Sequence, residues 1–71
     1  MQFRVFAALD KPKSFYYFNC DEDGEPYLDS VQEKDDFEKC RNNIYDVKDL
    51  GVKKLSEMDD EWLENINKEL W

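Results

Sequence analysis

Hydrophobic and polar residues alternate over the first part of the chain. In "QFRVFAAL", residues 2–9, one face carries Phe3, Val5, Ala7 and Leu9 and the other carries Arg4, Phe6 and Ala8. This two-residue period is typical of a β-strand. A second stretch, "FYYFNC", is rich in residues that favour strands, and Pro12 lies in the short turn between the two. We therefore predict an antiparallel hairpin of strands over residues 2–9 and 14–20.

An acidic turn, "CDEDGEPY", follows the second predicted strand. Asp-Gly between two β-forming runs is a strong hairpin signal, and we expect Asp23 and Gly24 at the positive-φ positions of a tight turn. The segment "PYLDS" then predicts a third short strand over residues 26–29. Pro26 belongs at its start, because proline cannot donate to the ladder.

The same stretch also matches the first half of the EF-hand pattern at Asn19, Asp21, Asp23 and Gly24. The match fails at position twelve, where Ser30 replaces the bidentate glutamate that calcium requires. The preceding residues also have the pattern of a strand rather than a helix. We therefore favour a hairpin over a calcium loop.

Two helices are predicted in the second half of the chain. Ser30 and Glu33 match a capping box, and the helix over residues 31–44 places Phe37, Cys40 and Ile44 on one stripe. This stripe could continue to Leu50, with Gly51 as the residue after the helix, although two asparagines at 42–43 oppose that continuation.

The second predicted helix covers residues 57–70, with Ser56 as its cap. Its apolar residues recur at helical spacing: Leu55, Met58, Trp62, Ile66 and Leu70. The predicted fold is a single α+β domain over residues 1–71, a small antiparallel β-meander of two or three strands packed against two C-terminal helices. At this length one core gives only about 3–5 kcal/mol of net stability.

The titratable residues restrict the possible chemistry. The chain has no histidine, which excludes Ser–His and Cys–His nucleophilic pairs. Cys20 and Cys40 alone make a poor zinc site. We expect both to be buried free thiols, with a disulfide bridge between them or a reactive thiol as the alternatives. We predict no enzymatic activity, no metal and no cofactor.

Charge carries the most information about function. The net charge is −8, and it is concentrated in two tracts: residues 14–37 carry eight acids against one lysine, and residues 57–71 carry six against one. Nucleic acid and anionic membranes are disfavoured as direct partners, because both are bound through lysine and arginine. The expected partner is a protein with a basic surface.

In size and charge the chain resembles small virus-encoded inhibitors of DNA- or RNA-handling enzymes, which display carboxylates in place of phosphates. The resemblance is compositional and covers no motif. It implies an acidic protein-binding module or inhibitor that mimics nucleic acid. The candidate binding residues are the carboxylates of both tracts: Asp21, Glu22, Asp23, Glu25, Asp35, Asp36, Asp59, Asp60 and Glu61.

An aromatic interaction patch without mimicry is the alternative, because interface energy concentrates in Trp, Tyr and Arg. Its candidate residues are Tyr16, Tyr17, Tyr27, Tyr45 and Trp71. This version includes a self-assembly role, with a homodimer as one form. The start of the chain lacks the basic residues of a signal peptide, so we expect a cytoplasmic protein, in the host cell cytoplasm if it is viral.

Overall fold

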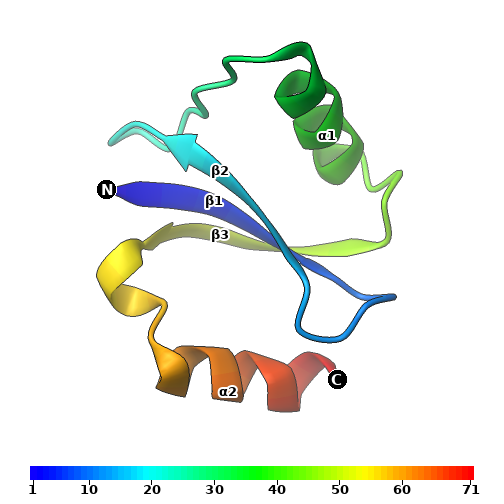
Figure 1. Ribbon diagram of the computed structural model, residues 1–71, viewed down its shortest axis with the longest axis vertical. Coiled ribbons are helices and arrows are strands. Elements are labelled where there is room, and N and C mark those ends of the chain that lie inside the picture. The colour runs from blue at the N-terminus through cyan, green and yellow to red at the C-terminus, as the bar shows by residue number, and fades with distance from the viewer.

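The computed structural model describes all 71 residues and contains one three-stranded sheet and two helices (Figure 1). The elements in chain order are β1 (Gln2–Ala8), β2 (Phe15–Cys20), α1 (Val31–Arg41), β3 (Val47–Lys54), the 3₁₀ helix η1 (Leu55–Glu57) and α2 (Asp60–Leu70). The sheet is antiparallel with strand order β2-β1-β3. The α+β class is therefore confirmed. The meander and the placement of both helices at the C-terminus are wrong, because α1 lies between β2 and β3.

The predicted strand over residues 26–29 is wrong. Only an isolated bridge joins Pro26 to Cys20, and the backbone N–H of Tyr27 donates to the Asn19 carbonyl at 2.7 Å. The chain then leaves the sheet. The third strand is β3, which pairs with the other edge of β1 from Gln2 to Ala8.

The helix predicted over residues 31–44 begins as expected but ends earlier. Ser30 is its N-cap, with its hydroxyl accepting from the Glu33 N–H at 3.0 Å. Asn43 adopts a positive φ of 56° just after the helix ends at Arg41. Ile44 consequently lies off the buried stripe and is 68 % exposed.

The proposed continuation of this helix to Leu50 is also wrong. Gly51 has a positive φ of 81° within β3 and does not follow a helix. The β1–β3 register shifts between Val5 and Phe6, whose partners are Gly51 and Asp49, so that Leu50 is the extra residue of a bulge.

The α1 side of the sheet carries an aromatic core. Phe6 of β1, Phe18 of β2 and Phe37 of α1 meet edge to face, with ring centroids 5.3–6.1 Å apart. Cys40 completes this buried cluster. The three rings and Cys40 are four of the eight buried residues of the whole chain, so this cluster supplies most of the packing on this face.

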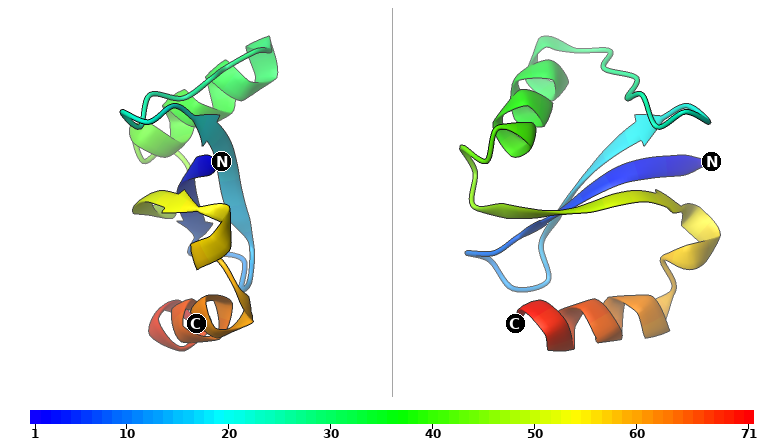
Figure 2. Two further views of the ribbon diagram at one scale, coloured as in Figure 1. Left: turned by 90° about the vertical axis from the view of Figure 1, so that its left-hand side faces the viewer. Right: turned by 180° about the vertical axis from the view of Figure 1, so that it is seen from behind.

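Helix α2 covers the opposite face of the sheet (Figure 2). Val5 and Ala7 point to this side by strand alternation and are fully buried. Phe15 of β2 contacts Trp62 and Trp71, with ring centroids 5.8 and 5.5 Å apart. No side chain of α2 is fully buried, so this helix shields the sheet without forming a second core.

Helix α2 begins three residues later than predicted. Its N-cap is Asp59, whose carboxylate accepts from the Trp62 N–H at 2.9 Å, and not Ser56. Leu55, expected on the buried stripe, lies in η1 and is 59 % exposed. Neither helix is long and apolar enough to cross a membrane.

Candidate functional site

The acidic turn after β2 has a fixed backbone shape. The Gly24 N–H donates to the Asp21 carbonyl at 3.0 Å, and the Asp21 N–H donates to the Glu25 carbonyl at 2.9 Å. Gly24 has a φ of 85°, whereas Asp23 has an ordinary negative φ. The turn is thus a three-residue loop ending in a left-handed glycine. The prediction of positive φ at both Asp23 and Gly24 is wrong for Asp23.

The Asp21 carboxylate stabilises this turn from inside. Its Oδ1 accepts from the backbone N–H groups of Asp23 and Glu25, both at 2.9 Å. This aspartate therefore shapes the turn and is not a free binding group. Aspartate side chains commonly accept backbone hydrogen bonds in turns. A hairpin can therefore contain acidic residues at the spacing that also occurs in calcium-binding loops.

The turn is also anchored to the sheet. The Gln2 side chain donates to the Asp21 carbonyl, and a Cβ added at Gly24 would lie 3.1 Å from Cγ2 of Val52 on β3. The turn therefore folds back over the α1 side of the sheet, and its tip is held in one place.

Three carboxylates of the turn remain exposed and form no ion pair: Glu22, Asp23 and Glu25. Next to them, Tyr27 is 55 % exposed and Met1 is 86 % exposed. A cleft of about 470 Å³ between the turn and the chain start is lined by Met1, Gln2, Cys20, Asp21, Glu22, Tyr27 and Lys54. We call Met1, Glu22, Asp23, Glu25 and Tyr27 the turn-end surface.

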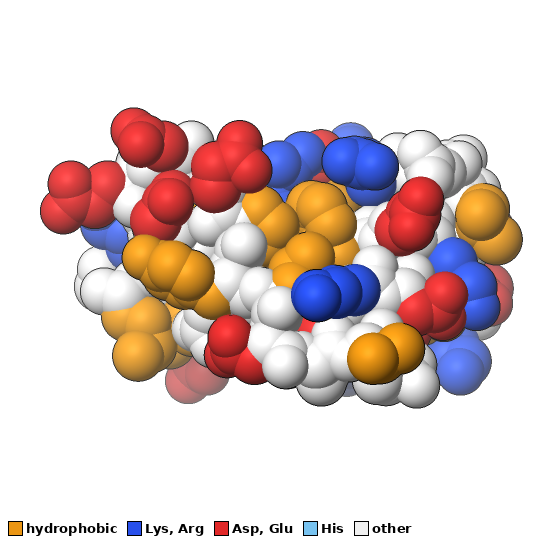
Figure 3. All heavy atoms as spheres, turned by 90° about the horizontal axis from the view of Figure 1, so that it is seen from above, with side chains coloured by type: hydrophobic (Ala, Val, Ile, Leu, Met, Phe, Trp, Pro, Cys, Tyr) orange, Lys and Arg blue, Asp and Glu red, His pale blue; other side chains and the backbone are white.

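Figure 3 views the molecule from the α1 side. Acidic side chains gather at the end where the turn lies, while hydrophobic and basic side chains occupy the middle. This end therefore carries the densest group of acidic side chains on the face, and single acidic side chains also lie farther along it.

The predicted acidic residues of α1 are engaged within the protein. Asp35 forms an ion pair with Lys39 at 2.9 Å. Asp36 accepts from the Tyr45 hydroxyl at 2.9 Å and from Gln32 at 3.0 Å. That hydrogen bond raises the pKa of Tyr45. Asp35 and Asp36 thus stabilise α1 and the segment after it.

The acidic residues at the start of α2 are separated from the turn. Asp59 is the N-cap, while Asp60 and Glu61 are exposed. The turn lies on the α1 side of the sheet and α2 on the other side (Figure 1). The structure therefore does not bring the two acidic tracts onto one surface.

The predicted aromatic residues also fall into different groups. Tyr16 stacks on Tyr45, with ring centroids 5.3 Å apart, and Trp71 packs on Phe15. Tyr17 is 48 % exposed on β2, where its ring lies beside Phe3 and Phe15. The five aromatics therefore do not form one patch.

Both cysteines are free and buried, as expected. Burial raises the pKa of the Cys40 thiol to about 11, and the nearby Asp36 carboxylate adds to the effect. This thiol is protonated at neutral pH. No group of three or more cysteine and acidic side chains is arranged to hold a metal ion.

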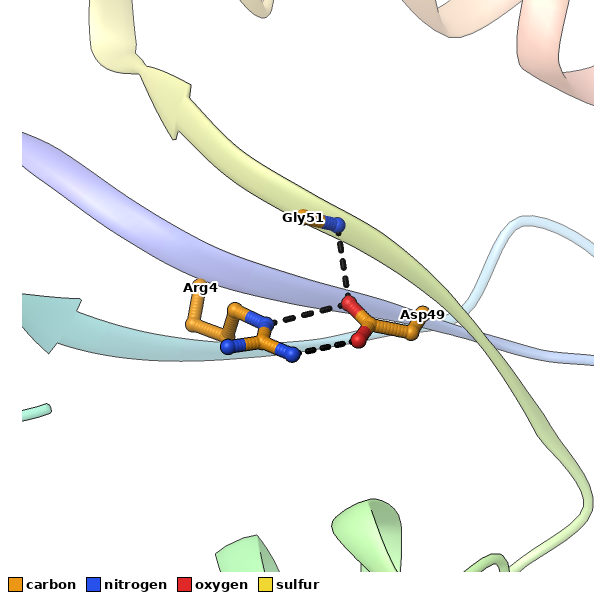
Figure 4. A network of polar contacts seen from close by, with 3 residues as sticks. All are labelled: Arg4, Asp49 and Gly51. Atoms are coloured by element: carbon orange, nitrogen blue, oxygen red, sulfur yellow. Dashed lines mark hydrogen bonds and ion pairs between the residues drawn. The ribbon is translucent and has the colours of Figure 1, made fainter. Parts of the chain in front are cut away.

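The ion pair between Arg4 and Asp49, which the sequence analysis did not predict, stabilises the bulge of β3 (Figure 4). The Arg4 guanidinium donates two hydrogen bonds to Asp49, and the Gly51 N–H donates to the same carboxylate at 2.8 Å. The Arg4 side chain holds the pKa of Asp49 below its usual value. The available signal was Arg4 itself, a lone charge inside an apolar strand.

A second cleft, of about 500 Å³, lies between the turn and α1. It contains the cations Arg4, Lys34 and Arg41 and the carboxylates Glu25 and Glu38. The opposite charges nearly balance, and Arg4 is already paired with Asp49. This cleft does not extend the negative field of the turn-end surface.

Comparison of the chain with protein-family models, with curated proteins and with solved structures found no match.

Proposed function

We propose that the protein is a small binding module that docks its turn-end surface on a basic surface of a partner protein. The observation that carries this proposal is that Glu22, Asp23 and Glu25 have no ionic partner within the chain, yet lie on a turn of fixed shape. Charges placed in this way favour rapid and selective association with cations.

The anchoring of the turn supports binding in a second way. Binding costs free energy when loops and side chains must be ordered. The internal hydrogen bonds of Asp21 and the contact between Gly24 and Val52 set the backbone before a partner arrives. Less of the interaction free energy is then lost to ordering.

Tyr27 and Met1 give the same surface an apolar component. Exposed charges at an interface rim contribute little affinity, whereas a buried aromatic anchor contributes much of it. The expected partner surface therefore combines lysine or arginine side chains with an apolar depression for Tyr27.

Nucleic-acid mimicry is a narrower form of this proposal, and it is limited to the turn. Asp60 and Glu61 lie across the sheet and beside the positive end of the α2 dipole, which partly compensates their charge. A mimic using both acidic tracts would need them on one face.

The test compares capture from native cells by three forms of the protein. The turn variant carries Glu22→Gln, Asp23→Asn and Glu25→Gln, which remove charge and keep shape. The control carries Asp60→Asn and Glu61→Gln. We expect a protein with a basic surface to be retained by the wild type and the control and lost from the turn variant.

Addition of salt should weaken the same interaction steeply. Retention of the same proteins by the turn variant, or loss from the control alone, would contradict the proposal. An affinity that is independent of salt would shift the interpretation to an aromatic interface.

A further inference from the structure

Helix α2 is attached to the rest of the molecule by apolar contacts alone. Every hydrogen bond of α2 forms within the helix or with its N-cap residue Asp59. Its one ion pair, between Lys68 and Glu64, is also internal to the helix. No hydrogen bond or ion pair therefore joins α2 to the sheet, to α1 or to the acidic turn.

The aromatic contacts between α2 and the sheet all involve one side chain of β2, Phe15. Its ring centroid lies 5.8 Å from that of Trp62 and 5.5 Å from that of Trp71. No side chain of α2 is fully buried. A cleft of about 330 Å³, lined in part by Lys13 and Leu63, also separates the later turns of the helix from the β1–β2 turn. Helix α2 thus rests on the sheet without close packing along its whole length.

One buried polar group opposes this attachment. The indole N–H of Trp71 is shielded from solvent and has no hydrogen-bond acceptor. A buried donor without an acceptor costs free energy, which is recovered when the group returns to water. Closure of α2 on the sheet therefore carries a cost that opening removes.

Helix α1 is held in a different way. It buries Phe37 and Cys40 in the aromatic core, and its Asp36 carboxylate accepts from the Tyr45 hydroxyl at 2.9 Å. Local stability is lowest where few apolar groups are buried and few polar contacts cross to the rest of the fold. The sheet and α1 therefore form the stable part of the molecule, and α2 is its least stable element.

We propose that α2 is a lid that opens as one unit at η1 while the sheet and α1 stay folded. The lid is joined to β3 through η1, at its N-terminal end (Figure 1). A helix of 11 residues is only marginally stable in water by itself, so α2 unfolds when it leaves the sheet. Opening uncovers Val5 and Ala7, which are fully buried in the closed form. The lid thereby controls access to this apolar face of the sheet.

Native-state hydrogen exchange of the backbone amides, followed by NMR, tests the lid in the wild-type chain. The amides of residues 64–68 should share one protection factor, at least about tenfold below that of the β1 amides. Low concentrations of urea should accelerate exchange strongly in β1 and very little in α2. The reason is that the denaturant dependence of an opening scales with the surface that it exposes.

Two substitutions determine which part of the fold opens first. Phe37→Leu weakens the aromatic core, which is the same in the closed and open forms. It should therefore accelerate exchange in β1 at least about fivefold and leave exchange in α2 unchanged. Trp62→Ala is the matched variant, because it weakens only the closed form, from which both openings start. It should accelerate exchange in α2 and in β1 by a similar factor.

Equal protection of α2 and β1, or equal acceleration of both by Phe37→Leu, would overturn the proposal, because α2 would then open only with global unfolding. Protection that declines residue by residue toward Trp71 would also overturn it, since the helix end would fray without a lid. The turn keeps the hydrogen bonds of Asp21 in the open form. Each of these results would leave turn-dependent capture of a basic partner unaffected, so the two proposals fail separately.

Discussion

Replacing the two left-handed glycines with alanine separates the anchoring of the turn from ordinary backbone strain. Gly24 and Gly51 have nearly equal φ values, 85° and 81°. A Cβ at Gly51 would meet nothing within 4 Å, whereas one at Gly24 would lie 3.1 Å from Cγ2 of Val52. Gly51→Ala is therefore a matched control for Gly24→Ala.

The expected magnitudes follow from this difference. An alanine in the left-handed region costs about 1–2 kcal/mol, and that cost applies at both positions. At Gly24 the added methyl also requires Cγ2 of Val52 to move by a few tenths of an ångström, which adds a cost at the low end of the off-rotamer range, about 0.5 kcal/mol. Gly24→Ala should therefore lower the free energy of unfolding by about 0.5 kcal/mol more than Gly51→Ala.

Urea unfolding monitored by tryptophan fluorescence measures both changes, and a double-mutant cycle identifies the contact. In a Val52→Ala background Cγ2 is absent, so the additional cost of Gly24→Ala should disappear. If Gly24→Ala is no more destabilising than Gly51→Ala, or if Val52→Ala does not relieve it, then the turn does not rest on β3 as described.

Further predictions concern the core, the acid limb of stability and the helix cap. Phe37→Ala should cost about 3–5 kcal/mol, close to the whole stability of a domain of this size, so circular dichroism should show a largely unfolded chain; a wild-type melting curve would contradict this. The Arg4 side chain holds the pKa of Asp49 in the folded protein below its usual value. The ion pair between them therefore stabilises the fold fully above the unfolded-state pKa of aspartate, about 4. This stabilisation is lost as the pH falls through the pKa that Asp49 has in the folded protein. In the Arg4→Gln variant the free energy of unfolding should depend less on pH in that acid range. If its pH dependence is unchanged, the Arg4–Asp49 ion pair is not the cause of the acid destabilisation. Asp59→Ala should cost about 1 kcal/mol in urea unfolding through loss of the α2 cap, and equal destabilisation by Asp60→Ala would argue against that role.

Local signals in the sequence predicted β1, β2, the Ser30 cap and most of α2. Each of these elements is encoded by side-chain alternation or by helical spacing in its own residues. The third strand was assigned wrongly because local pattern does not determine which segment pairs with β1. The "PYLDS" segment has β-forming residues, but β3 takes the edge of β1 that remains free.

The candidate site was predicted only in part. Charge composition identified Glu22, Asp23 and Glu25, which the structure leaves exposed. It could not show that Asp21 and Asp36 are used by intramolecular hydrogen bonds, since a carboxylate has the same formal charge whether or not it is partnered. Nor could composition place the turn and the start of α2 on opposite sides of the sheet.

Backbone ¹H–¹⁵N chemical-shift changes on titration with a deca-lysine peptide test the central claim most directly. We expect the largest changes at residues 22–27, small changes at Asp60 and Glu61, and loss of the turn response in the variant with Glu22→Gln, Asp23→Asn and Glu25→Gln. Changes that are largest at the start of α2, or that persist in the variant, would contradict the assignment of the turn-end surface as the binding site.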